Sequence, residues 1–145
     1  MIRTVRHVGI VVKSIGTILP FYRDILGLKV VREAQEPAPF IDQLLGFSGC
    51  SLITVKLASD EGETLIELLE FQSPAVHSFP QSGLSDPGIT HIALTVRNID
   101  DLYSRLIKEG IEFVSPPIIS PDGHAKVAFC QDPSGNYLEL VEERS

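Results

Sequence analysis

Two histidines and two glutamates stand at matching places in the two halves of the chain. His7 and His91 each open a short apolar stretch, in the strings His-Val-Gly-Ile-Val and His-Ile-Ala-Leu-Thr. Glu67 and Glu139 each interrupt a later one, in Leu-Ile-Glu-Leu-Leu and Tyr-Leu-Glu-Leu-Val. Two imidazoles and two carboxylates suit a divalent ion such as Zn, Ni, Co, Mn or ferrous Fe, whose charge balances the carboxylates. These four residues are therefore our candidate metal ligands.

Strand alternation indicates that the four side chains avoid the faces that pack under helices. In a strand, residues two apart share a face, so His7 lies opposite the apolar set Val8, Ile10 and Val12, and His91 is placed in the same way. An ionised glutamate on an apolar face costs several kcal/mol unless it is paired, so Glu67 and Glu139 call for a shared cation. Alone, such a histidine is usually structural and such a glutamate is usually solvated. We expect Glu70 and Glu142, at strand ends, to be solvated.

The repetition extends along the whole chain. Residues 7–31 align with residues 91–114 with one gap, and each half closes on a similar apolar strand. Between them, residues 74–88 are rich in Pro, Ser and Gly, which is typical of an exposed connector, and we expect His77 within it to be solvated. We therefore divide a single domain of residues 1–145 into module one (1–73), a connector (74–88) and module two (89–145).

Each module reads as a strand, a helix and then further strands. Apolar residues at helical spacing follow both opening strands, and Gly27 and Gly110 end the two helices. Pro20 predicts that the first helix either starts late, with Thr17 as its cap, or kinks at the proline. The remaining strands are expected at 28–33, 51–57, 64–71, 112–115, 125–131 and 136–142. The predicted fold is α+β, with two tandem βαβββ modules whose mixed sheets form a partly open barrel around a metal cleft.

Composition excludes several classes of function. The 145 residues carry 12 Lys plus Arg against 19 Asp plus Glu, a net charge of −7, so we expect no nucleic-acid partner and no polybasic membrane contact. The first apolar run is too short for a signal peptide or a membrane span, which indicates a cytoplasmic protein. Cys50 and Cys130 lie in strand-like runs, where we expect buried thiols; a disulfide or a reactive thiol is the alternative.

At these residues the chain resembles the vicinal oxygen chelate superfamily. The resemblance covers nearly the whole chain through four strings: Phe-Tyr-Arg-Asp-Ile-Leu-Gly-Leu at 21–28, Ile-Glu-Leu at 66–68, Thr-His-Ile-Ala-Leu at 90–94 and Asp-Pro-Ser-Gly-Asn-Tyr-Leu-Glu at 132–139. The superfamily includes glyoxalase I, methylmalonyl-CoA epimerase, extradiol dioxygenases and the bleomycin and fosfomycin resistance proteins. The resemblance implies a paired βαβββ fold, a homodimer, and a divalent ion held at His7, Glu67, His91 and Glu139.

What the resemblance implies about chemistry depends on the coordination positions left open. Four protein ligands on an octahedral ion leave two, which suits a small substrate that chelates through two oxygens. The metal then stabilises an enediolate or enolate while Glu67 or Glu139, our candidate catalytic residues, moves the proton. We therefore expect a lyase or isomerase of the glyoxalase or epimerase type. The alternatives are a ferrous extradiol dioxygenase, which uses two His and one carboxylate, and a binding protein that sequesters a drug or metabolite.

Departures from individual members leave the substrate open. Positions at which glyoxalase I has an Arg and an Asn for glutathione hold Val11 and Phe71 here. The closing turn, Asp-Pro-Ser-Gly, is shorter than the glycine-rich turn of the epimerase.

Several softer candidates remain. His124 is either an exposed loop residue or an acid–base group. Glu33 or Glu36 is a candidate second base. Residues 34–49 read as a short helix that serves as a lid, a plain surface element or a dimer contact.

Overall fold

The computed structural model describes residues 1–76 and 83–145 and divides the chain into two compact units, 1–78 and 79–145. The prediction for His77 falls on residues 77–82, which lie outside the described residues. In the described part of the chain, no helix combines the length and the apolar character needed to cross a membrane.

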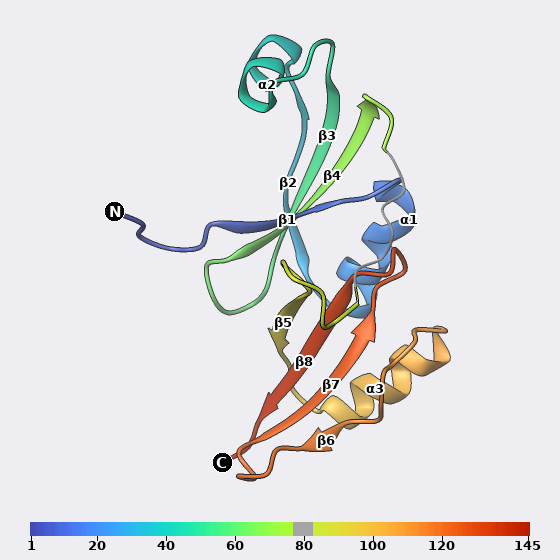
Figure 1. The fold of residues 1–145 in the computed structure, drawn as a ribbon. Coiled ribbons are helices and arrows are strands. Elements are labelled where there is room, and N and C mark those ends of the chain that lie inside the picture. The colour runs from blue at the N-terminus through green and yellow to red at the C-terminus, as the bar shows by residue number, and fades with distance from the viewer. Residues whose placement is uncertain (77–82) are drawn as a thin grey trace. The chain divides into compact units, whose positions relative to one another are not determined.

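Unit one contains a four-stranded mixed sheet and three helical segments (Figure 1). The sheet order is β1-β4-β3-β2, in which β1 runs parallel to β4 and the other neighbours are antiparallel. Along the chain the elements are β1 (His7–Val11), α1 (Ile15–Pro20), η1 (Phe21–Ile25), β2 (Lys29–Glu36), α2 (Ala38–Leu45), β3 (Ser51–Ala58) and β4 (Leu65–Ser73).

Unit two repeats the topology with one principal helix. Its sheet order is β5-β8-β7-β6, again with one parallel pair, β5 with β8. The elements are β5 (His91–Thr95), α3 (Ile99–Lys108), β6 (Ile118–Ile119), β7 (Ala125–Gln131) and β8 (Tyr137–Glu143). The prediction of an α+β fold with two tandem βαβββ modules is confirmed, and each sheet is open rather than closed.

Alternation along the strands builds the core of each unit. Leu68 on β4 and Leu140 on β8 have no exposed surface, and Ile66 and Leu138 two residues earlier are also buried. Fully burying one such side chain contributes roughly 1.5–3 kcal/mol. Ile18 and Phe21 in unit one, and Ile99 and Leu106 in unit two, are buried helix residues. Glu67 and Glu139, each one residue before these leucines, therefore lie on the opposite face of their sheets.

Glu70 and Glu142 correct one expectation, because neither is simply solvated. Glu70 accepts a hydrogen bond from the backbone N–H of Ile15 at 2.7 Å, and Glu142 accepts one from Asn98 N–H at 2.8 Å. Both residues follow Leu68 and Leu140 at a two-residue interval and so share the faces of these buried leucines. Each carboxylate satisfies an N–H at the start of a helix, where negative charge is favourable. The same device thus ties α1 to β4 and α3 to β8.

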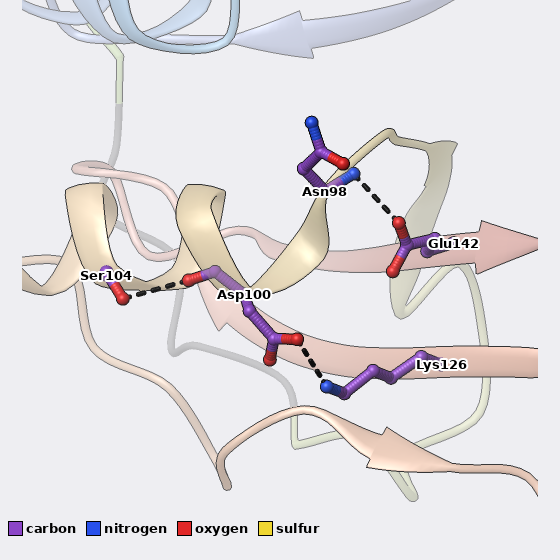
Figure 2. Close-up of polar contacts among 5 residues, drawn as sticks. All are labelled: Asn98, Asp100, Ser104, Lys126 and Glu142. Atoms are coloured by element: carbon purple, nitrogen blue, oxygen red, sulfur yellow. Dashed lines mark hydrogen bonds and ion pairs between the residues drawn. The ribbon is translucent and has the colours of Figure 1, made fainter.

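A second polar contact holds α3 to its sheet. Lys126 on β7 donates to the Asp100 carboxylate at 2.5 Å, beside the Glu142 contact (Figure 2). Ser104 donates within the helix to the Asp100 carbonyl oxygen. Together these contacts fix the first turn of α3 against β7 and β8.

Pro20 shapes the first helical region differently from the predicted late start. The helix begins at Ile15 after Ser14, not after Thr17, and Pro20 is its last residue. The segment then continues as η1, a π-helical turn in which Leu26 N–H donates to the Phe21 carbonyl oxygen. Because proline lacks an N–H and crowds the preceding turn, the regular bonding pattern stops there, in line with the predicted alternative of a kink.

The predicted strand at 112–115 was wrong in extent. Phe113 makes an isolated bridge to Cys130, and the regular strand β6 forms only at Ile118–Ile119. Residues 116 and 117 are both proline and have no N–H to donate, so the ladder to β7 is interrupted between the two pieces. Cys50 and Cys130 are free, buried thiols, which confirms the expectation for both.

Candidate functional site

In unit one, strand pairing brings His7 against Glu67. His7 is paired with Leu65 across the parallel β1–β4 ladder, and Gly9 with Glu67. His7 and Glu67 therefore share a face, two residues out of register, and His7 Nε2 lies 3.0 Å from Glu67 Oε2. The Glu67 side chain is only 10% exposed, whereas that of His7 is 35% exposed. The predicted donors of module one are in direct contact.

Lys56 is a member of this group that the sequence analysis missed. It lies on β3 directly opposite Glu67, and its Nζ is 3.2 Å from Glu67 Oε1. The Lys56 side chain is 18% exposed, so the ion pair is largely removed from solvent. Both carboxylate oxygens of Glu67 are thus engaged, one by an imidazole and one by an ammonium group.

Unit two repeats the histidine–glutamate contact but not the lysine. His91 pairs with Tyr137 and Ala93 with Glu139, so the geometry of β1 and β4 recurs, and His91 Nε2 lies 3.3 Å from Glu139 Oε2. The position opposite Glu139 on β7 is Phe129. Its ring meets the His91 ring edge-on, with centroids 5.1 Å apart. The Glu139 side chain is 24% exposed, more than that of Glu67.

The spacing within each pair fits two ligands of one ion. Donors about 2.1 Å from a metal lie about 3.0 Å apart in adjacent octahedral positions and about 3.4 Å apart in tetrahedral ones. The observed 3.0 Å and 3.3 Å are hydrogen-bonding distances between an imidazole nitrogen and a carboxylate oxygen, and they are also compatible with these separations. Within the described residues, no group of three or more His, Cys, Asp or Glu comes together as a metal-binding cluster. Each unit therefore supplies one fitting pair of donors.

The softer candidates lie at a distance from these pairs or on other faces. His124 is exposed and precedes β7, five residues before Phe129, which corresponds to about 16 Å along a strand. Glu33 pairs with Val55 and so lies on the face opposite Lys56. Glu36 shares the Lys56 face and accepts a hydrogen bond from Thr54 at 3.3 Å.

Helix α2 confirms the predicted short helix within residues 34–49 and packs on the Glu67 face of its sheet. Its buried residue Ile41 forms a cluster with Cys50 and Leu52, against which Leu69 and Phe71 also pack. Leu69 and Phe71 follow Glu67 at two-residue intervals and therefore share its face. The end of this face at Leu69 and Phe71 is therefore apolar. A role for α2 as a lid stays a prediction.

The comparisons with known proteins identify the family. The model of the Glyoxalase/Bleomycin resistance protein/Dioxygenase superfamily matches residues 4–140, and the chain belongs to this superfamily. The chain is 28% identical over 143 residues to a lactoylglutathione lyase of Schizosaccharomyces pombe, covering 94% of this chain but only 46% of that protein, so it spans about half of that relative. It is 26% identical over 144 residues to the lactoylglutathione lyase of Salmonella typhimurium, covering 99% and 93% of the two chains.

A solved structure shows the same fold. A glyoxalase family protein from Bacillus cereus superimposes with a TM-score of 0.89 at 23% identity, covering 99% of this chain and 97% of that one. At this level of identity the likeness concerns the fold.

The two positions that the sequence analysis singled out against a glutathione substrate carry apolar side chains. Val11 is 48% exposed at the end of β1. The Phe71 ring packs edge-on against Phe47, with centroids 5.9 Å apart. Neither position offers a charged or hydrogen-bonding side chain to a peptide substrate.

Proposed function

We propose that the protein is a divalent-metal-dependent lyase or isomerase whose ion is held by His7, Glu67, His91 and Glu139. The observation that carries the proposal is the pair of histidine–glutamate contacts at ligand spacing, one per unit and at the same register in both. The bound ion would stabilise negative charge that develops on substrate oxygens during proton transfer. Membership in the superfamily supports this chemistry, and a cytoplasmic homodimer is part of the proposal.

The two glutamates have different environments, and we assign them different roles. Glu67 contacts both His7 and Lys56, so its carboxylate has little freedom to move. Glu139 contacts His91 on one oxygen and is more exposed. A carboxylate that moves a proton must approach the substrate and withdraw, which suits the less constrained group. Glu139 is therefore the proton shuttle, and Glu67 acts as a fixed ligand.

We infer the substrate class from two features of the proposed site. Four protein ligands would leave two coordination positions of the ion open, and the neighbouring side chains are apolar. A small molecule with two adjacent or β-related oxygens, such as an α-keto thiohemiacetal or a short acyl thioester, would use both positions. The relatives are named lactoylglutathione lyases. The apolar side chains of Val11 and Phe71 favour a smaller or less polar thiol than glutathione.

One observation favours a second candidate function. Because Lys56 already engages Glu67, the donors left without an ion-paired lysine are His7, His91 and Glu139. Two histidines and one carboxylate form the ligand set of ferrous dioxygenases. An extradiol dioxygenase is therefore the alternative, and a requirement for anaerobic ferrous reconstitution would distinguish it.

The test is elemental analysis of protein purified without a polyhistidine tag or chelator. We expect about one Ni, Zn, Co or Mn per chain, with the content sharply reduced in both His7→Ala and His91→Ala. His124→Ala is the matched control and should retain the ion. A protein that stays metal-free after reconstitution would refute the proposal and leave a metabolite-binding protein.

Turnover tests the division of roles between the two glutamates. Glutamine keeps an oxygen donor but loses basicity, so Glu139→Gln should lower kcat by about 100-fold or more, the scale of a general base. Glu67→Gln should affect metal affinity more than kcat. Equal losses of kcat in the metal-saturated variants would contradict the assignment.

A further inference from the structure

Lys56 is a cation placed at a carboxylate that is proposed to bind a cation. Its Nζ lies 3.2 Å from Glu67 Oε1, and both side chains are largely buried, at 18% and 10% exposure. A lysine side chain is rarely buried to this extent without a partner of opposite charge, and here the partner is Glu67. The other face neighbour of Lys56 across the ladder is Arg32 on β2, which is exposed.

We propose that Lys56 is the resident counter-ion of Glu67, a positioning residue that compensates the buried carboxylate in the metal-free protein and competes with the divalent ion for it. This inference rests on the proposed function, because it takes Glu67 as a metal ligand. His7 and Lys56 divide the two oxygens of Glu67 between them. Binding of an ion at Oε2 would add two positive charges to a group that already carries an ammonium neighbour.

Lys56 has two opposite effects on the affinity of the site for a metal ion. By holding Oε1, Lys56 fixes the orientation of Glu67, and loss of such an outer partner typically weakens a site about 10–100-fold. Against this, a unit charge and a doubly charged ion repel each other at a separation of a few ångströms, where little solvent screens them. Glu67 remains oriented by its buried strand position and, in the loaded site, by the ion itself, so the orientation lost with Lys56 is small. The repulsion therefore dominates, and Lys56 lowers the affinity for the ion.

Unit two provides an internal control for this argument. Phe129 occupies the position opposite Glu139 that Lys56 occupies opposite Glu67. Glu139 thus has the same histidine contact and the same register without an ammonium group opposite it. A lysine at position 129 should reproduce the effect of Lys56 on the other carboxylate.

The experiment measures the affinity of the full chain for Zn²⁺ and Co²⁺ by competition with a chromophoric chelator. We expect Lys56→Met and Lys56→Gln to bind about 10-fold or more tightly than the wild type, whereas Lys56→Arg, which keeps the charge, stays within about threefold. Phe129→Lys should bind about 10-fold more weakly. Lys126→Met removes a lysine paired with Asp100 and is the control for net charge. A purely structural role for Lys56 would weaken binding in both neutral variants.

A second measurement follows the melting temperature of the metal-free protein. Lys56→Met should melt several degrees lower than the wild type, because Glu67 is left buried with one partner. The loss should disappear in the Glu67→Gln background. Variants that melt too low to titrate leave Lys56→Arg and Phe129→Lys to report the effect of charge.

The outcomes separate this inference from the proposed function. If the wild type binds one ion and His91→Ala does not, but the neutral variants at position 56 bind equally or more weakly, the Lys56 proposal is overturned and the proposed function stands. If the wild type binds no ion while Lys56→Met does, the inference is supported in its strongest form. If neither binds, both proposals fail.

Discussion

The two histidine–glutamate pairs have one backbone design and two chemical environments. In both units a histidine is the first residue of the strand that runs parallel to the glutamate strand. The glutamate pairs with the small residue two positions after that histidine, so the histidine and the glutamate share a face. The residue opposite the glutamate on the neighbouring strand differs, Lys56 in unit one and Phe129 in unit two. A duplicated fold can thus keep its donor geometry while one carboxylate is ion-paired and buried and the other is more exposed and has no ammonium group opposite it.

The prediction with the largest expected effect tests whether the two units are packed alike on the sheet faces opposite Glu67 and Glu139. Leu68 and Leu140 are register equivalents, each directly following a candidate ligand glutamate, and neither has exposed surface. We expect Leu68→Ala and Leu140→Ala each to lower the free energy of unfolding by about 3 kcal/mol, because each leaves a cavity in a core. Denaturant unfolding measures both.

The exposed residue Val11 supplies the control for those variants. Val11→Ala, on an edge strand, should cost less than about 1 kcal/mol. If the two leucine variants differed by more than about 2 kcal/mol, the units would not be equivalent in packing, and the comparison of their glutamates would lose its basis.

The sequence carried enough information for the fold and for the pairs, but not for what surrounds them. Periodicity and the internal repeat predict the modules because strand alternation and helical spacing are local properties of the chain. His7 and Glu67 could be placed on one face for the same reason. The partner of Glu67 depends on which residue of β3 stands opposite it, and that register is set by the loop between β3 and β4 and by the irregularity between Ser51 and Leu52.

Two local errors have physical causes of the same kind. Glu70 looked solvated because only the spatial return of the chain brings the N–H of Ile15 to its carboxylate. Side-chain alternation at 112–115 indicated a strand, but it does not show how many residues pair with β7. Only Phe113 bridges to that strand, and the next regular pairing, at Ile118–Ile119, lies beyond two prolines that have no N–H to donate. In the first case the hydrogen-bond partner is distant in sequence, and in the second the backbone lacks N–H donors.

A smaller effect concerns the glutamates that anchor the helices, which the two units share. Glu70→Ala and Glu142→Ala should each lower the free energy of unfolding by about 1 kcal/mol, because a backbone N–H at a helix start loses its acceptor. Glutamine at either site keeps an acceptor oxygen and should cost about half as much. Thermal unfolding followed by circular dichroism measures the change.

The exposed carboxylate of Glu143, next to Glu142 and outside the helix contact, is the control for charge in these variants. Glu143→Ala should leave the melting temperature unchanged. A loss for Glu142 with none for Glu70 would show that only unit two relies on this anchor, which would sharpen the difference between the units.

The smallest effect compares Cys50 and Cys130, one buried thiol in each unit. Burial raises the pKa of both, that of Cys130 to about 12, with the Asp132 charge adding to the shift. Because the thiolate is the reactive form, a rise from 9 to 12 lowers the reactive fraction of Cys130 by about a thousandfold below pH 9, and reactivity increases as pH rises.

The neighbours of the two thiols predict different labelling rates in the folded protein. Cys50 packs against Ile41 of α2, a helix of only eight residues, and we expect this helix to open locally before the sheet unfolds. Cys130 is the last but one residue of β7, pairs with Leu138 of β8 and has no exposed surface, so we expect it to become accessible only when the sheet unfolds. Labelling with a thiol reagent at pH 8, followed by mass spectrometry, should therefore modify Cys50 first. Equal rates that track the global free energy of unfolding would mean that α2 does not open separately, and that the Glu67 face is as firmly closed at its apolar end as the core beneath it.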